Sequence, residues 1–297
     1  MMSFDDFNVV PNILTIDFES WVHTYQVRRT NSIDRKKMDN GFVLCAGTKL
    51  LDMLAKHNVV ATFFIVSEIS EWYPELIEKI EAQGHEIALH SHTHRILLSE
   101  SDLIDEMKNS VEFIHQFNIQ GFRAPRGFFR NGYLKSLTKF QIFYDSSGYG
   151  MLEAIKPISG IVEIPISAWA YSSAKCDRYY FGPLNWKMLM EILPFGSPFL
   201  TGLLGPFFLK CIQFENRRRR PTIICLHLWQ VFHPEDRFKF MLWLVSHEIL
   251  SLPYCMNCYH LFERLLETSK FITMRQFLDN YLYKIKCTNE MCAYAKS

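Results

Sequence analysis

The sequence predicts a single α/β domain folded as a barrel. Segments typical of strands and of helices alternate from the beginning, which favours parallel strands joined by right-handed crossovers. About seven strand-like segments occur in the chain, whose 297 residues lie within the range of one α/β barrel. No internal repeat divides the sequence. We therefore expect one domain over residues 1–297, with its core motifs within 12–230.

The expected strands differ in how apolar they are. The segment 12–18 begins the series, and 59–66 is almost entirely apolar and rich in β-branched and aromatic residues. Such a run is typical of a parallel strand that is buried on both faces. The remaining strands are expected at 85–90, 119–123, 142–145, 161–166 and 222–226.

Helices are expected between these strands. One covers about 43–58, and another covers 72–83 and ends at Gly84, because glycine readily takes the left-handed conformation of a helix C-terminus. Ser99 is a suitable N-cap for the next helix. Helices over about 236–286 are expected to complete the domain.

Composition excludes several classes of protein. Apolar residues make up 48% and charged residues 21%, which excludes a largely disordered chain. The net charge of +1 gives no overall field for nucleic acid. The N-terminal segment lacks the apolar run of a secretory signal, and no stretch reaches the ~18 apolar residues of a membrane span. We expect a cytoplasmic protein, with peripheral attachment to the inner face of the membrane as the alternative.

The eight cysteines are expected to be free thiols rather than a disulfide framework. Cys255 and Cys258 have the spacing of a zinc-binding pair, but Cys287 and Cys292 are four residues apart and lie far along the chain. A structural metal site at these four positions is therefore the weaker alternative.

Titratable side chains gather where the expected strands end. They are Asp17, Glu19, His90, His94, Arg123, Asp145 and His227. Because the carboxyl ends of parallel strands share one face of a barrel, these groups are expected to form one site. Two neutral imidazoles four residues apart, with one carboxylate, suit Zn²⁺, Fe²⁺ or Co²⁺. The alternative for His90 and His94 is a pair of polar surface histidines.

Five short motifs resemble the polysaccharide deacetylases of carbohydrate esterase family 4, also called the NodB-homology family. Residues 15–19 (Thr-Ile-Asp-Phe-Glu) stand where that family has T-F-D-D, and 90–94 (His-Ser-His-Thr-His) match H-[ST]-x-x-H in full. Residues 123–128, 144–147 and 225–229 resemble the third, fourth and fifth motifs. The motifs occur in the family's order.

The resemblance implies a distorted (β/α)7 barrel and metal-dependent hydrolysis of an N-acetyl group on an amino sugar. It implies that His90 and His94 bind a divalent metal, with Zn²⁺ expected and Co²⁺, Fe²⁺ or Ni²⁺ as alternatives. This sequence departs from the family by having Asp-Phe-Glu instead of two adjacent aspartates. Because residues i and i+2 of a strand face the same side, Asp17 and Glu19 can both face the site, and Phe18 faces away. We prefer Asp17 as general base and Glu19 as metal ligand, although the two roles can be exchanged.

The resemblance also implies roles for three further residues. Arg123 would hold Asp17 ionised, Asp145 would orient His227, and His227 would protonate the departing amine. The alternatives are a structural ion pair for Arg123, a turn-forming side chain for Asp145 and a core histidine for His227. Aromatic residues that could stack on a sugar are Phe128, Trp169, Tyr171 and Trp229, although aromatic residues at strand ends more often pack in the core.

An uncharged segment lies between the last two expected strands. Residues 195–209 contain no charge and are followed by four arginines, Arg217–Arg220. This pattern predicts a peripheral membrane contact, with apolar insertion and attraction to anionic lipid. The alternative is a buried segment followed by a solvated arginine run.

Three functions are compatible with these observations. The first is an N-deacetylase acting on an amino sugar in a glycan or its precursor, which could be lipid-linked. The second is a deformylase or another hydrolase of non-peptide amides with the same barrel. The third is a non-catalytic protein that binds glycan or lipid.

Overall fold

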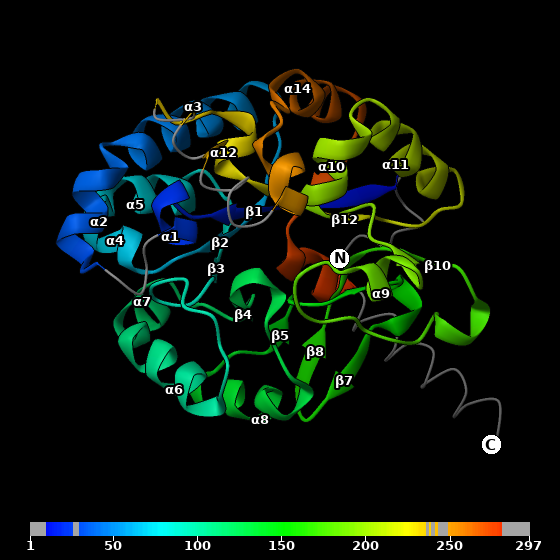
Figure 1. Cartoon of the computed structure of the whole chain (residues 1–297), viewed down its shortest axis with the longest axis horizontal. Helices are drawn as coiled ribbons and strands as arrows, with labels where there is room; N and C mark the ends of the chain where they lie inside the picture. Colours follow the sequence, from blue (N-terminus) through cyan, green and yellow to red (C-terminus); the bar gives the residue numbers. More distant parts are fainter. Residues whose placement is uncertain (1–9, 26–29, 236–237, 239–240, 243–248, 281–297) are drawn as a thin grey trace.

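A computed structural model describes the chain apart from residues 1–9, 26–29, 236–237, 239–240, 243–248 and 281–297. The predicted α/β class and the distorted barrel are confirmed. One curled sheet carries parallel neighbours in the order β12, β1, β2, β3, β4, β5 and β8, and helices surround it (Figure 1). The antiparallel strand β7 forms one edge of this sheet.

The parallel strands agree with the seven expected from the sequence. Their bounds are β1 (Pro11–Phe18), β2 (Thr62–Ile65), β3 (Glu86–Leu89), β4 (Gly121–Phe122), β5 (Tyr144–Asp145), β8 (Ile161–Glu163) and β12 (Ile223–His227). The other strands are β6 (Tyr149–Gly150), β7 (Lys156–Ile158), β9 (Ile166–Ser167), β10 (Trp169–Ala170), β11 (Ile192–Leu193) and β13 (Lys270–Ile272), which pairs with β1.

The expected helices are also present. The helices before β4 are α1 (Trp21–Tyr25), α2 (Ser32–Asp39), α3 (Phe42–Lys56), α4 (Glu68–Trp72), α5 (Pro74–Ala82), α6 (Glu100–Asn109) and α7 (Val111–Gln116). Those after β4 are α8 (Leu134–Leu137), α9 (Trp186–Leu189), α10 (Pro198–Leu204), α11 (Phe207–Arg217), α12 (Leu228–Val231) and α14 (Tyr259–Thr268). Part of the predicted helical region 236–286 lies outside the described residues.

Helix α5 ends, and helix α6 begins, at the residues that the sequence predicts. Gly84 follows α5 with a φ of +79°, a conformation that glycine adopts without steric cost. Ser99 caps α6: its hydroxyl accepts a hydrogen bond from the Asp102 amide, and the Asp102 side chain accepts one from the Ser99 amide. This reciprocal arrangement is a capping box.

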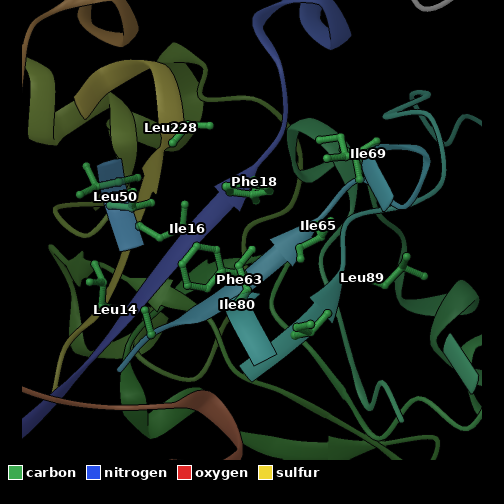
Figure 2. Packing of buried hydrophobic residues seen from close by; sticks show 14 of the residues in the cluster. Leu14, Ile16, Phe18, Leu50, Phe63, Ile65, Ile69, Ile80, Leu89 and Leu228 are labelled. Atoms are coloured by element: carbon green, nitrogen blue, oxygen red, sulfur yellow. The ribbon is translucent and has the colours of Figure 1, made fainter. Parts of the chain in front are cut away.

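Strand β1 separates the core from the site by the alternation of its side chains. Leu14, Ile16 and Phe18 belong to the main hydrophobic cluster, which includes Leu50 of α3 (Figure 2). Thr15 and Asp17 lie on the other face, because successive side chains of a strand point to opposite sides. The expectation that Phe18 faces away from Asp17 is therefore confirmed.

The parallel series begins at β12 and ends at β8, and these two strands are not paired with each other. The segment around Gly196 connects β12 to β9, the strand that follows β8 in the chain. Its amide donates to the carbonyl of Ser167 in β9 (2.8 Å), and its carbonyl accepts from the Cys225 amide in β12 (2.8 Å). A side chain has no room here, since a Cβ atom would lie 2.3 Å from the carbonyl oxygen of Ile223. Glycine thus permits the backbone contact that closes this side of the barrel.

The uncharged segment 195–209 lies largely within the protein, which favours the alternative interpretation of a buried segment. Phe195, Leu200 and Phe208 are buried, and of the large apolar side chains only Leu203 and Phe207 are mostly exposed. The segment lacks charge because most of it packs against the barrel. Arg220 forms an ion pair with Glu153 (2.8 Å) instead of standing free.

The arginine run is nevertheless exposed over 217–219, as the alternative interpretation expected. None of the helices in the described part of the chain is long and apolar enough to cross a bilayer. Peripheral membrane contact and the cytoplasmic location remain predictions.

Candidate active site

The carboxyl ends of the parallel strands bring the predicted site residues to one face of the barrel. Asp17 lies in β1, His90 follows β3, Arg123 follows β4, Asp145 ends β5 and His227 ends β12. All of these except Asp145 line one cavity of about 740 Å³, together with Glu19 and His94. The structure therefore brings the predicted site residues other than Asp145 together around one cavity, while their roles stay predictions.

Glu19, His90 and His94 form a group that could hold a metal ion. One ligand atom from each lies within 4.8 Å of the other two, and all three residues are buried. His90 Nδ1 donates to the carbonyl oxygen of Arg123 (2.8 Å), which fixes the tautomer and leaves Nε2 with its lone pair. Burial lowers the pKa of both imidazoles, so they are held in the neutral form that binds metals.

The carboxylate of this group supports the same assignment. Glu19 Oε2 lies 3.0 Å from His94 Nε2, yet it has no hydrogen-bond partner among the described residues. Burial raises the pKa of Glu19 well above its usual value, and the nearby charge of Asp17 raises it further. A buried carboxylate with an unsatisfied oxygen beside two neutral imidazoles fits a divalent cation of the zinc type.

Asp17 is held in the ionised state by Arg123. The guanidinium Nη1 donates to Asp17 Oδ1 (2.6 Å), while its Nε and Nη2 donate to Ser146. Burial alone would raise the pKa of Asp17, but Arg123, with His90 and His227, outweighs burial and lowers it to about 2. Asp17 is thus ionised at neutral pH before the reaction, whereas Glu19 depends on a further positive charge for ionisation. This difference favours Asp17 as the base and Glu19 as the ligand.

His227 faces both first-motif carboxylates. Its Nε2 lies 3.7 Å from Asp17 Oδ2 and 3.6 Å from Glu19 Oε1. Its ring stacks on Trp229, with centroids 4.5 Å apart and an interplanar angle of 7°. Burial lowers the pKa of His227 to about 4, so the side chain is neutral near pH 7.

Asp145 has other partners than the predicted one. Its carboxylate accepts from the hydroxyl of Ser147 (2.7 Å) and is hydrogen-bonded to Glu163. Among the described residues no hydrogen bond joins it to His227. Burial raises the pKa of both carboxyls, which favours a proton shared between them. Asp145 therefore shapes the turn whose Ser146 binds Arg123, as the turn-forming alternative proposed.

Of the predicted sugar-stacking residues, Tyr171 and Trp229 line the cavity. Trp169 lies elsewhere: it packs on Phe195 with centroids 4.6 Å apart, and its indole donates to Glu215 (2.8 Å). Phe128 is half-buried and is not among the lining residues. Further aromatic residues that line the cavity, and that the sequence did not single out, are Tyr149, Trp186, Phe199 and Tyr254.

Two further features were missed from the sequence. Cys225, in the fifth motif, donates its thiol hydrogen bond to Asp17 Oδ2 (3.2 Å). A buried network also fixes the corner after Glu19: the Ser20 amide donates to His23, and His23 contacts Glu68 (2.8 Å). Cys225 belongs to the fifth motif, residues 225–229, so its place at the site could have been predicted. No sequence pattern indicates the contact between His23 and Glu68, which are 45 residues apart.

Cys255 and Cys258 are both buried. Cys287 and Cys292 lie outside the described residues, so the proposed four-cysteine site stays an untested alternative. Within the described part of the chain, the Glu19–His90–His94 group is the one set of ligand side chains close enough to share an ion.

Comparison with known proteins supports the resemblance. Residues 22–144 match the polysaccharide deacetylase family, and this span includes the His motif and Arg123. A peptidoglycan-N-acetylglucosamine deacetylase of Bacillus cereus is 32% identical over 96 residues, 31% of this chain and 34% of that protein. A peptidoglycan-N-acetylmuramic acid deacetylase of Bacillus subtilis is 31% identical over 105 residues, 33% of this chain and 39% of that protein.

The resemblance to the polysaccharide deacetylases is thereby confirmed for this part of the chain, which spans about a third of the length of these curated relatives. A crystal structure of a proposed polysaccharide deacetylase from Mycobacterium smegmatis extends the likeness in fold. It matches 90% of this chain and 99% of its own with a TM-score of 0.51 and 17% identity. This similarity shows the shared fold alone.

Proposed function

We propose that the protein is a metal-dependent hydrolase that removes the N-acetyl group of an amino sugar in a glycan or glycan precursor. The observation that carries this proposal is the buried Glu19–His90–His94 group beside the Asp17–Arg123 pair in one cavity. Relatives named as deacetylases of N-acetylated sugars supply the substrate class.

Each residue then has a defined task. Glu19, His90 and His94 hold a divalent cation, expected to be Zn²⁺, which when bound supplies Lewis-acid polarisation of the amide carbonyl. Asp17 accepts the proton of the attacking water, because Arg123 keeps it ionised at neutral pH. Trp229 holds the imidazole ring of His227 by stacking.

The leaving amine needs a proton, and His227 is placed to give it. Since His227 is neutral before the reaction, the proton that it delivers must arrive during turnover. Asp17, which takes the proton of the attacking water, lies 3.7 Å from His227 Nε2 and is its source. We infer that the proton taken from water by Asp17 reaches the amine by way of His227.

The ligand assignment is tested by metal content. We expect His90→Ala and His94→Ala to abolish stoichiometric metal binding and activity with the fold largely kept. His92→Ala is the matched control, because His92 belongs to the same motif but bonds to Ser67 and does not line the cavity. Full metal occupancy in either ligand variant would overturn the assignment.

The two first-motif carboxylates are separated by their variants. Asp17→Asn should keep the metal and lose at least ~10²-fold in activity, the range expected for a general base. Glu19→Gln should lose the metal. If the metal is lost with Asp17→Asn instead, the two roles are exchanged.

The reaction itself is tested with the metal-loaded protein and a panel of N-acetylated and N-formylated sugars. Release of acetate supports the deacetylase and release of formate supports the deformylase alternative. Binding without release of either acid supports a non-catalytic glycan-binding protein.

A further inference from the structure

The cavity that contains the metal-binding group is much larger than an acetamido group requires. Its volume of about 740 Å³ lies in the range of sites for whole drug-sized ligands. Its charged lining side chains are Asp17, Glu19, Arg123 and Arg126, and of these only Arg126 is exposed. From Tyr149 onward, the described lining residues include no Asp, Glu, Lys or Arg.

The outer part of the cavity is built by one connection of the barrel. It is the segment 183–203, which contains α9, β11 and all of α10 except its last residue. This segment supplies mainly aliphatic and aromatic side chains: Leu184, Leu189, Leu193, Phe199, Leu200 and Leu203. Some of the uncharged side chains of this connection therefore line the same cavity as Asp17 and the Glu19–His90–His94 group.

This lining is unsuited to further sugar units. Sugar hydroxyls that lose water need hydrogen-bond partners, and each unpaired one costs about 1–3 kcal/mol. Asn185 is the one side-chain amide among the lining residues, and it is already engaged: Oδ1 accepts from the Met188 amide and Nδ2 donates to the Pro183 carbonyl. Apart from tyrosine hydroxyls, the outer cavity offers little to a polar ligand.

The exposed part of the lining is mainly apolar. Its exposed residues are Trp186 (70%), Tyr171 (60%) and Leu203 (60%), together with the polar residues Arg126 and Asn185. A hydrocarbon chain bound in the cavity can therefore extend out of it along apolar side chains. A long N-acyl group would begin at the metal ligands at the inner end, whereas a lipid attached to the sugar's other end would lie towards this mouth.

We propose that the outer cavity binds the hydrocarbon chain of a lipid-linked amino sugar whose N-acetyl group is presented to Asp17 and Glu19. This inference rests on the proposed deacetylase function and specifies its substrate class. The chemistry recognised is an unbranched or branched aliphatic chain on the sugar, not a longer glycan.

The test is a homologous series of n-alkyl glycosides of N-acetylglucosamine, used below their micelle concentrations. Burial of one methylene contributes about 0.8 kcal/mol, which corresponds to about fourfold in affinity or in kcat/KM. We expect kcat/KM to rise by up to about this factor per carbon until the cavity is filled. Calorimetric binding to chelator-treated protein should show the same trend, independently of turnover.

Two variants localise the effect. Leu189→Ser should reduce the gain per carbon, with each variant normalised to its own methyl glycoside. Met190→Ser is the matched control, because Met190 is the adjacent residue, is 77% exposed and does not line the cavity. It should keep the full chain-length dependence.

The outcomes separate this inference from the proposed function. Deacetylation of the methyl glycoside with no chain-length dependence of turnover or binding overturns the inference and keeps the function. Chain-dependent binding without hydrolysis of any sugar supports the inference and refutes the function. Preference for a long N-acyl group over a long aglycone overturns the inference, and absence of both binding and hydrolysis overturns both.

Discussion

Replacing Glu68 with glutamine removes the charge that Arg35 and His23 share behind the site. The Arg35 guanidinium binds both carboxylate oxygens, with Nε–Oε1 at 2.8 Å and Nη2–Oε2 at 2.7 Å, and His23 Nε2 lies 2.8 Å from Oε1. Burial alone would raise the pKa of Glu68, but these partners outweigh burial and lower it to about 2 from 4.5. Each pKa unit corresponds to about 1.4 kcal/mol, so the carboxylate contributes on the order of 3 kcal/mol at neutral pH.

The sign of the pH dependence follows from the lowered pKa. The contribution of Glu68 is fully present above the unfolded value near 4.5 and is lost as the pH falls towards the folded value of about 2. Glu68→Gln also leaves Arg35 buried without its partner, and breaking a buried pair costs about 3–5 kcal/mol. The variant should therefore be destabilised by about 3 kcal/mol or more at pH 7, and by progressively less below pH 4.5.

Urea unfolding in the presence of a chelator, at several pH values from 7 to 3, measures this difference free of metal binding. Glu71→Gln is the matched control in the same helix, since the Glu71 side chain is 60% exposed and lies 3.9 Å from His92. The reasoning is refuted if Glu68→Gln changes the free energy of unfolding by no more than the control does. The reasoning is equally refuted if the free energy of unfolding of Glu68→Gln differs from that of the unmodified protein by the same amount at every pH.

Three other predictions concern packing and capping, and all are measured as free energies of unfolding in urea. Gly196→Ala should cost at least about 2 kcal/mol because its Cβ would lie against a backbone carbonyl of β12, whereas Gly132→Ala, with open space around it, should cost much less. Phe208→Ala should cost about 3–5 kcal/mol because the ring is fully buried, and Phe207→Ala, at the exposed neighbouring position, should stay within about 0.5 kcal/mol; equal costs would contradict the burial of this segment. Ser99→Ala should cost about 1 kcal/mol through loss of the capping box; an unchanged stability would mean that the cap contributes nothing.

Local signals in the sequence determined the elements of this fold. The alternation along 12–18 was sufficient to place Asp17 and Phe18 on opposite faces of β1, because side-chain direction in a strand has a fixed period of two. Gly84 and Ser99 marked the end of one helix and the start of another, because the groups that cap a helix lie next to it in sequence. Parallel strands then required the polar residues at their ends to meet on one face.

Only the tertiary structure decided which of these residues touch. Arg123 reaches Asp17 across 106 positions, and Asp145 turns to Ser147 and Glu163 instead of His227. The uncharged segment 195–209 was open to either a membrane surface or the interior, and the contact of Gly196 with β9 and β12 places most of it inside. The physical reason is that the type of a residue determines whether its side chain favours water or the protein interior. Which neighbour covers that side chain depends on packing between segments that are far apart in the chain.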